Sequence, residues 1–281
     1  MNTAFLLMLG VTACYTVSSL SDKYAASKAK FSPNEFTFLM CSSMSVFLLF
    51  SLPFQEISFD FSFYAFLGVM LTAFCKLFEF KMCSAVLREM SAFELKAWLG
   101  ITLFVSYFTD ILFGEQIRML KLLCLVFTAA GLVMIVHSDK KEKVNYKRII
   151  IPLQLYMAAK YGYGLIIRSF SSHASSMMLL LPSLVIVSLI TLPLVDLKVY
   201  NERSKGTANV VAARIPNAVG MVMETAVICI SLASYSLIQP LILVSLFFIG
   251  LARSDYASKM NIIGSVICML GAIGFQLSGL I

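Results

Sequence analysis

Ionisable side chains interrupt several long apolar stretches of this 281-residue sequence. An ionised group inside a bilayer is costly, so each such residue is a candidate for a substrate or ion site. Lys76 lies near the centre of the stretch 63–87, and Glu79 follows three residues later. Because residues three positions apart share a face of an α-helix, the sequence predicts that these two side chains pair.

A second candidate lies in the stretch 149–168. Lys160 stands near its middle, beside Tyr161, Tyr163 and two glycines. Glycine has no side chain, so another backbone or a ligand can come close at this point. We therefore include the lysine and both tyrosines among the candidate substrate-binding residues.

The stretch 208–231 contains two further ionisable residues, Arg214 and Glu224. Ten residues separate them by about 15 Å along a helix, so we predict that they do not form a local pair. A lone Trp near the end of a span is commonly an interfacial anchor, and ligand stacking is the alternative. Weaker candidate binding residues are Trp98, Tyr235 and Gln239.

Two interpretations of the central charges remain open. They can face a water-filled cavity that receives a substrate, or they can neutralise one another in a dry interior and specify packing. Buried ion pairs do not reliably stabilise a fold, so we favour the cavity. Glu94, Lys96 and Asp110 lie within about five residues of a span end, and we expect their side chains to extend to water.

The composition is that of a membrane protein. Hydrophobic residues make up 59% of the chain, charged residues 13%, and the mean hydropathy is +0.88. A soluble domain carries about 25% charged residues, so soluble enzymes and nucleic-acid-binding proteins are excluded. With about 28 residues for each crossing and its turn, the length allows about ten transmembrane helices. We predict an all-α integral membrane protein.

Apolar stretches of spanning length form two sets of five. They cover residues 4–20, 34–52, 63–87, 92–113 and 119–136, and then 149–168, 175–195, 208–231, 234–252 and 260–280. The lysine-rich segment 139–148 lies between the sets and is predicted to be a basic linker. It divides the chain into a first five-helix repeat, 1–138, and a second, 149–281.

A shift of 140 residues brings the two halves into register. It places Ser91 on Ser231 and Gly131 on Gly271, and it aligns the fourth and fifth stretches with the ninth and tenth. Because each half has an odd number of spans, the halves must enter the membrane in opposite directions. The sequence therefore predicts an inverted repeat, an architecture common in secondary transporters.

Short motifs in each half resemble a known family. The first half has a small-residue turn at Ser91 and Ala92, the pair Gly114-Glu115 after the fourth span, and Gly131 late in the fifth. The second half has Ser231, Ser234, Pro240, Asp255 and Gly271 at related places. This pattern is similar to the EamA-type repeat of the drug/metabolite transporter (DMT) superfamily, although the Gly-Glu pair is replaced by Ser254-Asp255. The resemblance implies a ten-helix bundle and small-molecule transport, without naming the substrate.

The Gly114-Glu115 pair also has a local interpretation. Glycine can end a helix with a positive φ, and the glutamate then lies near the start of the next helix. We favour this structural role over contact with a substrate.

The sequence favours a secondary transporter that moves a small polar metabolite, amino-acid-like or organic-anion-like, by alternating access. Five cationic against four acidic groups inside the spans indicate an anionic or zwitterionic cargo. Zincin, nucleophile-elbow and P-loop motifs are absent, and the seven cysteines are dispersed, so we expect no enzyme activity, cofactor, metal site or disulfide framework. The alternatives are a membrane-embedded enzyme or lipid-handling protein, and a structural or sensory membrane protein.

The expected partners are the small-molecule substrate and the lipid bilayer, with no nucleic acid. We expect a multi-pass protein of a bacterial inner membrane. The coupling ion, the direction of transport and the oligomeric state stay open.

The orientation has two conflicting predictions. Most of the 22 Lys and Arg residues lie in loops on the side opposite the termini, including Lys23, Lys30, Arg88, Lys141 and Arg203. The positive-inside rule places those loops in the cytoplasm and the termini outside. The family resemblance implies the reverse. We follow the charge distribution, because it rests on residues of this chain.

Overall fold

The computed structural model describes residues 3–55, 57–100, 102–138, 146–252 and 259–278. Its α-helices are α1 (Thr3–Ser27), α2 (Pro33–Ser51), α3 (Phe63–Glu89), α4 (Ala92–Leu99), α5 (Thr102–Leu112), α6 (Met119–Ser138), α7 (Tyr146–Phe170), α8 (Ser176–Thr191), α9 (Lys198–Glu202), α10 (Ser204–Ile230), α11 (Leu232–Ala252) and α12 (Lys259–Leu277). Short 3₁₀ helices, η1 (Leu52–Phe54) and η2 (Leu192–Leu194), follow α2 and α8. No β-strand occurs in these described ranges.

Seven helical segments are long and apolar enough to cross a membrane: Ala4–Ala26, Pro33–Phe54, Phe63–Glu89, Glu94–Leu112, Ser176–Leu194, Ser204–Ile230 and Leu232–Ile249. Helices α6 and α12 contain shorter apolar segments. Helix α7 has 25 residues, but charged and polar side chains, among them Lys160, lower its hydropathy. The prediction of a multi-pass, all-α membrane protein is confirmed, whereas the count of ten spans stays a prediction.

The stretch 92–113, predicted as one span, is divided into α4 and α5. Ser91 caps α4, because its hydroxyl accepts a hydrogen bond from the Glu94 N–H at 3.0 Å. Gly100 ends α4, and a Cβ atom at this position would lie 2.2 Å from Leu132 of α6. Glycine weakens a helix and here admits a close neighbour, so the break occurs at this point.

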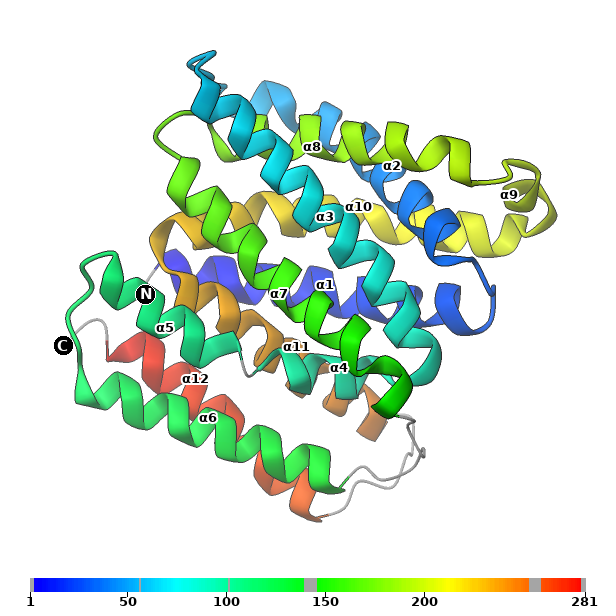
Figure 1. Cartoon of the computed structure of the whole chain (residues 1–281). Helices are drawn as coiled ribbons and strands as arrows, with labels where there is room; N and C mark the ends of the chain where they lie inside the picture. Colours follow the sequence, from blue (N-terminus) through cyan, green and yellow to red (C-terminus); the bar gives the residue numbers. More distant parts are fainter. Residues whose placement is uncertain (1–2, 56, 101, 139–145, 253–258, 279–281) are drawn as a thin grey trace.

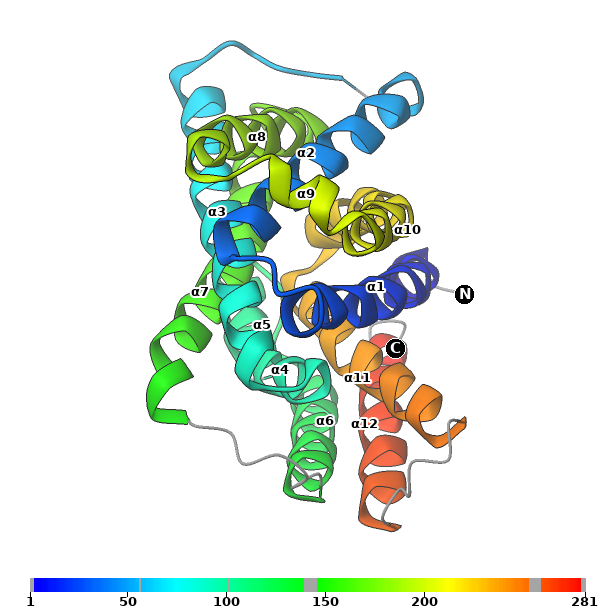
Figure 2. The same cartoon turned by 90° about the vertical axis from the view of Figure 1, so that its right-hand side faces the viewer.

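The long helices pack in pairs drawn from the two halves of the chain. Helix α1 lies along α10, α3 along α7, and α6 along α12, while α2 packs against α8 (Figures 1 and 2). Gly220 of α10 leaves room for Tyr15 of α1, whose ring would lie 2.7 Å from an added Cβ. The two halves are therefore interleaved, and the interior is built from both.

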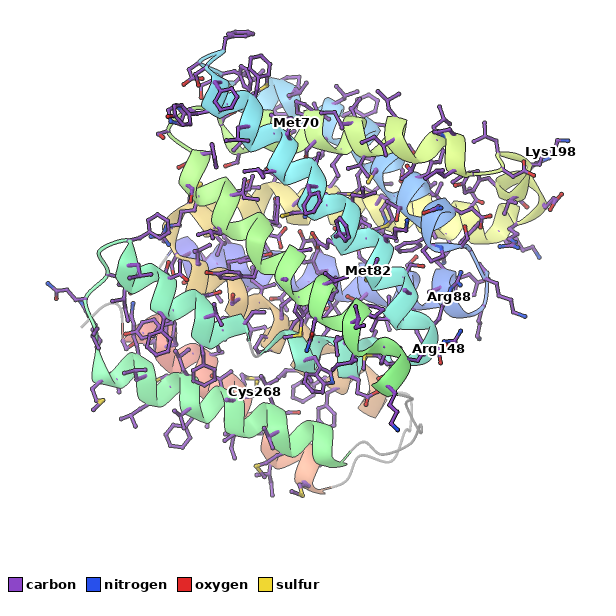
Figure 3. All side chains as sticks on the ribbon, viewed as in Figure 1. Met70, Met82, Arg88, Arg148, Lys198 and Cys268 are labelled. Atoms are coloured by element: carbon purple, nitrogen blue, oxygen red, sulfur yellow. The ribbon has the colours of Figure 1, made fainter. Side chains whose placement is uncertain are left out.

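Basic side chains gather at one end of the bundle. The basic end comprises the C-terminal ends of α1 and α3 and the N-terminal ends of α2, α7 and α10. Arg88, Arg148 and Lys198 lie there, at the right of Figure 3. The other end, called the terminal end, holds both chain termini (Figure 1). Most of the predicted linker, including Lys141, lies outside the described residues.

The close pairing of α6 and α12 depends on glycine. A Cβ atom at Gly131 would lie 2.6 Å from the Cys268 backbone nitrogen and 2.6 Å from the Gly264 carbonyl oxygen. We expect Gly131→Ala to force the helices apart and to destabilise the protein by about 1–3 kcal/mol. Thermal unfolding in detergent measures this change.

Gly162→Ala is the matched control for this prediction. Its added methyl would meet only the flexible Cys75 side chain, at 3.3 Å. Since alanine is the better helix former, this variant should unfold at or slightly above the wild-type temperature. Equal melting of the Gly131→Ala variant and the wild type would contradict the proposed role of Gly131.

Candidate substrate-binding site

Four of the predicted site residues meet in one buried ion cluster. Lys76 Nζ lies 2.8 Å from Glu79 Oε2, which confirms the predicted pairing on α3. Lys160 Nζ of α7 lies 3.1 Å from Glu79 Oε1 and 3.0 Å from Glu224 Oε1 of α10. No member is more than 7% exposed. We call these four residues the ion cluster; it joins three helices, and its two cations balance its two carboxylates.

Three tyrosines surround the ion cluster. The Tyr15 hydroxyl donates a 2.6 Å hydrogen bond to Glu224 Oε2, and the Tyr235 hydroxyl donates a 3.0 Å bond to the Lys160 carbonyl oxygen. Lys76 Nζ lies 3.4 Å from the centroid of the Tyr163 ring, a cation–π contact. The Tyr163 hydroxyl is buried and has no hydrogen-bond partner among the described residues.

A cavity of about 60 Å³ adjoins the ion cluster. At about 30 Å³ for each water molecule, that volume holds about two, so polar groups in it can be solvated. The lining comes from α1, α2, α3, α4, α7 and α10: Tyr15, Ser18, Ser19, Asp22, Met40, Glu79, Phe80, Cys83, Leu87, Ala92, Leu95, Lys96, Tyr156, Lys160, Asn217 and Met221. Most of these residues belong to the helix halves nearest the basic end, so the cavity lies between the ion cluster and that end.

Arg214 forms a separate buried pair beside the cavity. Its guanidinium contacts the Asp22 carboxylate of α1, and its Nε donates to the Val210 carbonyl oxygen at 3.1 Å. It does not pair with Glu224, as predicted from their spacing. Nothing in the sequence singles out Asp22, because it follows the apolar stretch 4–20 and its partner lies in the other half of the chain.

The remaining predicted residues are spread around the site. The Tyr161 hydroxyl lies 2.5 Å from Thr109 Oγ1 of α5. Trp98 packs against the hydrophobic core and is not part of the cavity lining. Gln239 Oε1 accepts a 3.1 Å hydrogen bond from Lys96 Nζ, which places Gln239 next to the lining. Tyr161 and Trp98 therefore contact other helices, and Gln239 lies close to the cavity.

The expectation that Asp110 reaches water at a span end is wrong, whereas Lys96 is half-buried and lines the cavity. Asp110 is fully buried and accepts hydrogen bonds from the backbone N–H groups of Leu232, at 2.9 Å, and Ala233, at 2.8 Å. The N-terminus of α11 covers the end of α5, and its unpaired N–H groups stabilise the carboxylate. Glu94 is half-buried near the start of α4.

The Asp110 carboxylate also contacts α7, and we call the contacts of this carboxylate with Arg168, Ser231, Leu232 and Ala233 the Asp110 junction. The carboxylate contacts the Arg168 guanidinium and accepts a 2.8 Å hydrogen bond from the Ser231 hydroxyl. Three helices, α5, α7 and α11, therefore meet at one carboxylate on the terminal-end side of the ion cluster. The cavity lies on the opposite side of the cluster.

The two halves also meet at the terminal end outside the apolar helices. The Asp60 N–H donates to the His173 carbonyl oxygen at 3.0 Å, and the Ser175 N–H donates to the Ser58 carbonyl oxygen at 2.8 Å. Hydrogen bonds from Ser62, with a smaller effect of His173, lower the pKa of the Asp60 carboxyl to about 2. This carboxylate therefore keeps its negative charge across the physiological pH range.

Metal binding and disulfide formation find no support within the described ranges. No group of three or more His, Cys, Asp or Glu residues there could hold a metal ion. All seven cysteines are free. The polar groups of the cavity are instead suited to hydrogen bonding and ion pairing with a small polar molecule.

Comparison with known proteins identifies a fold. No protein-family model and no curated protein matches the sequence. Among solved structures 24 chains match, and one of them, described as "Crystal structure of protein", is similar over 99% of both chains with a TM-score of 0.62 and 15% sequence identity. At this identity the likeness shows a shared fold alone.

We expect Asp110→Asn to destabilise the protein by on the order of 3 kcal/mol, because it leaves Arg168 without its partner and weakens the cap of α11. Thermal unfolding in detergent measures the loss. The matched control is Asp196→Asn, since Asp196 is exposed and its side chain accepts a 3.0 Å hydrogen bond from the Lys198 N–H at the start of α9, which the Asn oxygen can accept as well. A wild-type melting temperature for Asp110→Asn would contradict the role assigned to this carboxylate.

Proposed function

We propose that the chain is a multi-pass secondary transporter that moves a small polar metabolite across the membrane by alternating access. The observation that carries the proposal is the position of the ion cluster: four charged groups lie deep among apolar helices and adjoin a polar cavity. Carriers of this kind hold their substrate near the middle of the membrane, between two repeats.

The free energy needed to bury the charged groups of the ion cluster supports a functional role for them. Moving one charged group from water into a protein interior costs several kcal/mol even after relaxation, and hydrophobic replacements of buried pairs are often as stable. Lys160 and Glu79 also line the cavity, where a polar molecule can reach them. A purely structural network would not need to adjoin a cavity.

Repeated helix boundaries support the proposed inverted repeat. A shift of 140 residues carries the first residues of α4, α6 and η1 onto those of α11, α12 and η2: Ala92 onto Leu232, Met119 onto Lys259, and Leu52 onto Leu192. Exchanging the halves also converts the α1–α10 contact into the α7–α3 contact. We therefore propose ten spans in two inverted five-helix repeats, 1–138 and 149–281, joined by the segment 139–148.

Membership of the drug/metabolite transporter superfamily is part of the same proposal. Gly114 ends α5 with a φ of +100°, and Glu115 pairs with Lys121 in the following helix, in agreement with the local interpretation of this motif. The corresponding Asp255 lies outside the described residues. The family supplies the expectation of metabolite transport in a bacterial inner membrane.

In an alternating-access cycle, the two ends of the bundle open in turn. In this state the cavity lies on the side of the basic end, and the Asp110 junction and the Asp60–His173 contact hold the terminal end together. In the opposite state the terminal-end contacts separate while helices close over the basic end. The ion cluster lies between the two and joins helices of both halves.

We expect Glu224→Gln to lower uptake of amino acids or organic acids into proteoliposomes about tenfold or more, because an ionic hydrogen bond to Lys160 is lost. Lys160 keeps Glu79 as its partner, but the ion cluster then holds two cations and one carboxylate, so the melting temperature should also fall. Lys160→Ala leaves two carboxylates without their shared cation and should lower both uptake and melting temperature. Glu202→Gln, on the exposed surface, is the matched control.

Full uptake by the Glu224→Gln variant would remove this carboxylate from the proposed site. A lowered melting temperature with unchanged uptake per folded molecule would instead assign the ion cluster a structural role.

The positive-inside rule predicts that the basic end faces the cytoplasm. Two exposed positions form a matched pair: Lys205 in α10, at the basic end, and Ser172 in the turn between α7 and α8, at the terminal end. In a Cys229→Ser background, Ser172→Cys should react with an impermeant maleimide in intact cells. Lys205→Cys should react only after permeabilisation. The reverse pattern would establish the orientation implied by the family resemblance.

A further inference from the structure

We infer that Lys96 and Gln239 form the binding site for an anionic group, a carboxylate or a phosphate, of the molecule that enters the cavity. The inference rests on the proposed function and deepens it, because it assigns a chemical class to the substrate and a place to its charge. Neither residue belongs to the ion cluster.

Lys96 supplies a positive charge that the surrounding side chains do not balance. The cavity is lined by four ionisable groups of opposite kinds, Asp22, Glu79, Lys96 and Lys160. Asp22 is paired with Arg214, and the ion cluster is neutral within itself. Among the described residues, the hydrogen-bond partner of Lys96 is the neutral amide of Gln239. Counted together with their partners Arg214, Lys76 and Glu224, the charged groups at the cavity therefore sum to one excess positive charge.

The hydrogen-bond inventory at Lys96 leads to the same class of ligand. A lysine ammonium has three N–H donors and no acceptor. Gln239 Oε1 uses one of these donors, at 3.1 Å. Two donors remain on a side chain that lines the cavity, and a ligand that pairs with them must supply acceptors. A carboxylate or a phosphate supplies acceptors together with the missing negative charge.

Gln239 adds further unused donors. Because an ammonium can only donate, the carbonyl oxygen of the amide must face Lys96, and this fixes where the NH₂ group lies. That nitrogen, Nε2, is buried and has no hydrogen-bond partner among the described residues, and the residue is only 2% exposed. A buried donor without a partner is unfavourable, because it has lost its hydrogen bonds to water. An anionic oxygen bound at Lys96 Nζ would be next to this donor and could satisfy it.

The position of Lys96 in its helix has a simpler explanation that accounts for only part of these observations. Lys96 stands in the last turn of α4, where a positive charge interacts favourably with the helix dipole. A dipole contact alone would be equally served by a side chain extended into solvent. It does not explain why the ammonium lines a cavity beside a buried amide with unused donors.

Thermal unfolding of the purified full-length chain in an uncharged detergent tests the inference. The probes are acetate and inorganic phosphate against chloride at equal ionic strength, and then succinate against succinamide and glycerol 3-phosphate against glycerol. We expect at least one acid to raise the melting temperature while its uncharged counterpart does not. Phosphatidylglycerol and phosphatidylcholine in mixed micelles test a lipid headgroup as the source of the anionic group.

Two variants remove the charge in different ways. Lys96→Gln deletes the ammonium, and Gln239→Glu neutralises it by placing a carboxylate beside it. Each should weaken acid binding about 10- to 100-fold, the loss expected for a charge-assisted hydrogen bond. If Lys96→Gln fails to fold, Gln239→Glu makes the same test with the lysine in place. Lys198→Gln removes an exposed lysine from the basic end and should bind acids as the wild type does (Figure 3).

Three results would overturn the inference: stabilisation by the uncharged compounds equal to that by the acids, unchanged acid binding in the Lys96→Gln variant, or stabilisation by phosphatidylglycerol alone. Uptake of an uncharged polar solute that depends on Lys160 but not on Lys96 would also overturn it and would leave the proposed function in place. Absence of any Lys160-dependent uptake, with Lys96-dependent acid binding retained, would instead reject transport and keep the anion site.

Discussion

The rest of the interior depends on the two ion pairs that Lys160 forms, one with Glu79 and one with Glu224. The Lys160 ammonium lies 3.1 Å from Glu79 and 3.0 Å from Glu224, so it compensates two carboxylates that come from different helices and different halves of the chain. An unpaired charge at this depth would cost several kcal/mol, and that cost fixes α3, α7 and α10 at one separation. Lys76 and the Tyr15 hydroxyl then complete the set, since each carboxylate needs a second partner. The cavity follows from this arrangement, because the side chains that hold the ion cluster together cannot also fill the space beside it.

The two turns related by the 140-residue shift are stabilised in opposite ways. At the turn between α10 and α11, the free N–H groups of Leu232 and Ala233 are bound by the carboxylate of Asp110. At the turn between α3 and α4, the free carbonyl oxygens of Leu87 and Met90 each accept a 2.9 Å hydrogen bond from Lys23 Nζ. A helix N-terminus attracts a negative charge and a helix C-terminus a positive one. The Asp110 carboxylate and the Lys23 ammonium therefore each have the charge that suits the backbone groups they bind. The anion lies at the terminal end and the cation at the basic end, so the two turns differ in their chemistry.

Sequence reasoning located the charged residues of the site but could not pair most of them. Lys76 and Glu79 were predictable as a pair because their spacing on one helix is local. The contacts of Lys160 with Glu224, of Arg214 with Asp22 and of Asp110 with the start of α11 join residues from distant spans, and apolar periodicity contains no information on which spans are neighbours. Sequence reasoning places Asp110 in water for the same reason: a position near the end of a span is exposed only if no other helix covers it. The broken span at Gly100 was likewise invisible as a break, because a single glycine is common inside apolar helices.

The excess charge of the cavity connects binding with conformational change. With Lys96 unpaired, closing the empty cavity would remove a lone ammonium from water, and that desolvation opposes closure. An anionic group bound to Lys96 and Gln239 would make the contents of the cavity neutral, as the ion cluster already is. Closure of the loaded cavity would then bury a pair in place of a single charge. On the proposed function, the electrostatic interaction that selects an acidic substrate would also stabilise the occluded state, but only when the substrate is bound. The desolvation cost of Lys96 would then be enough to keep the empty carrier from closing.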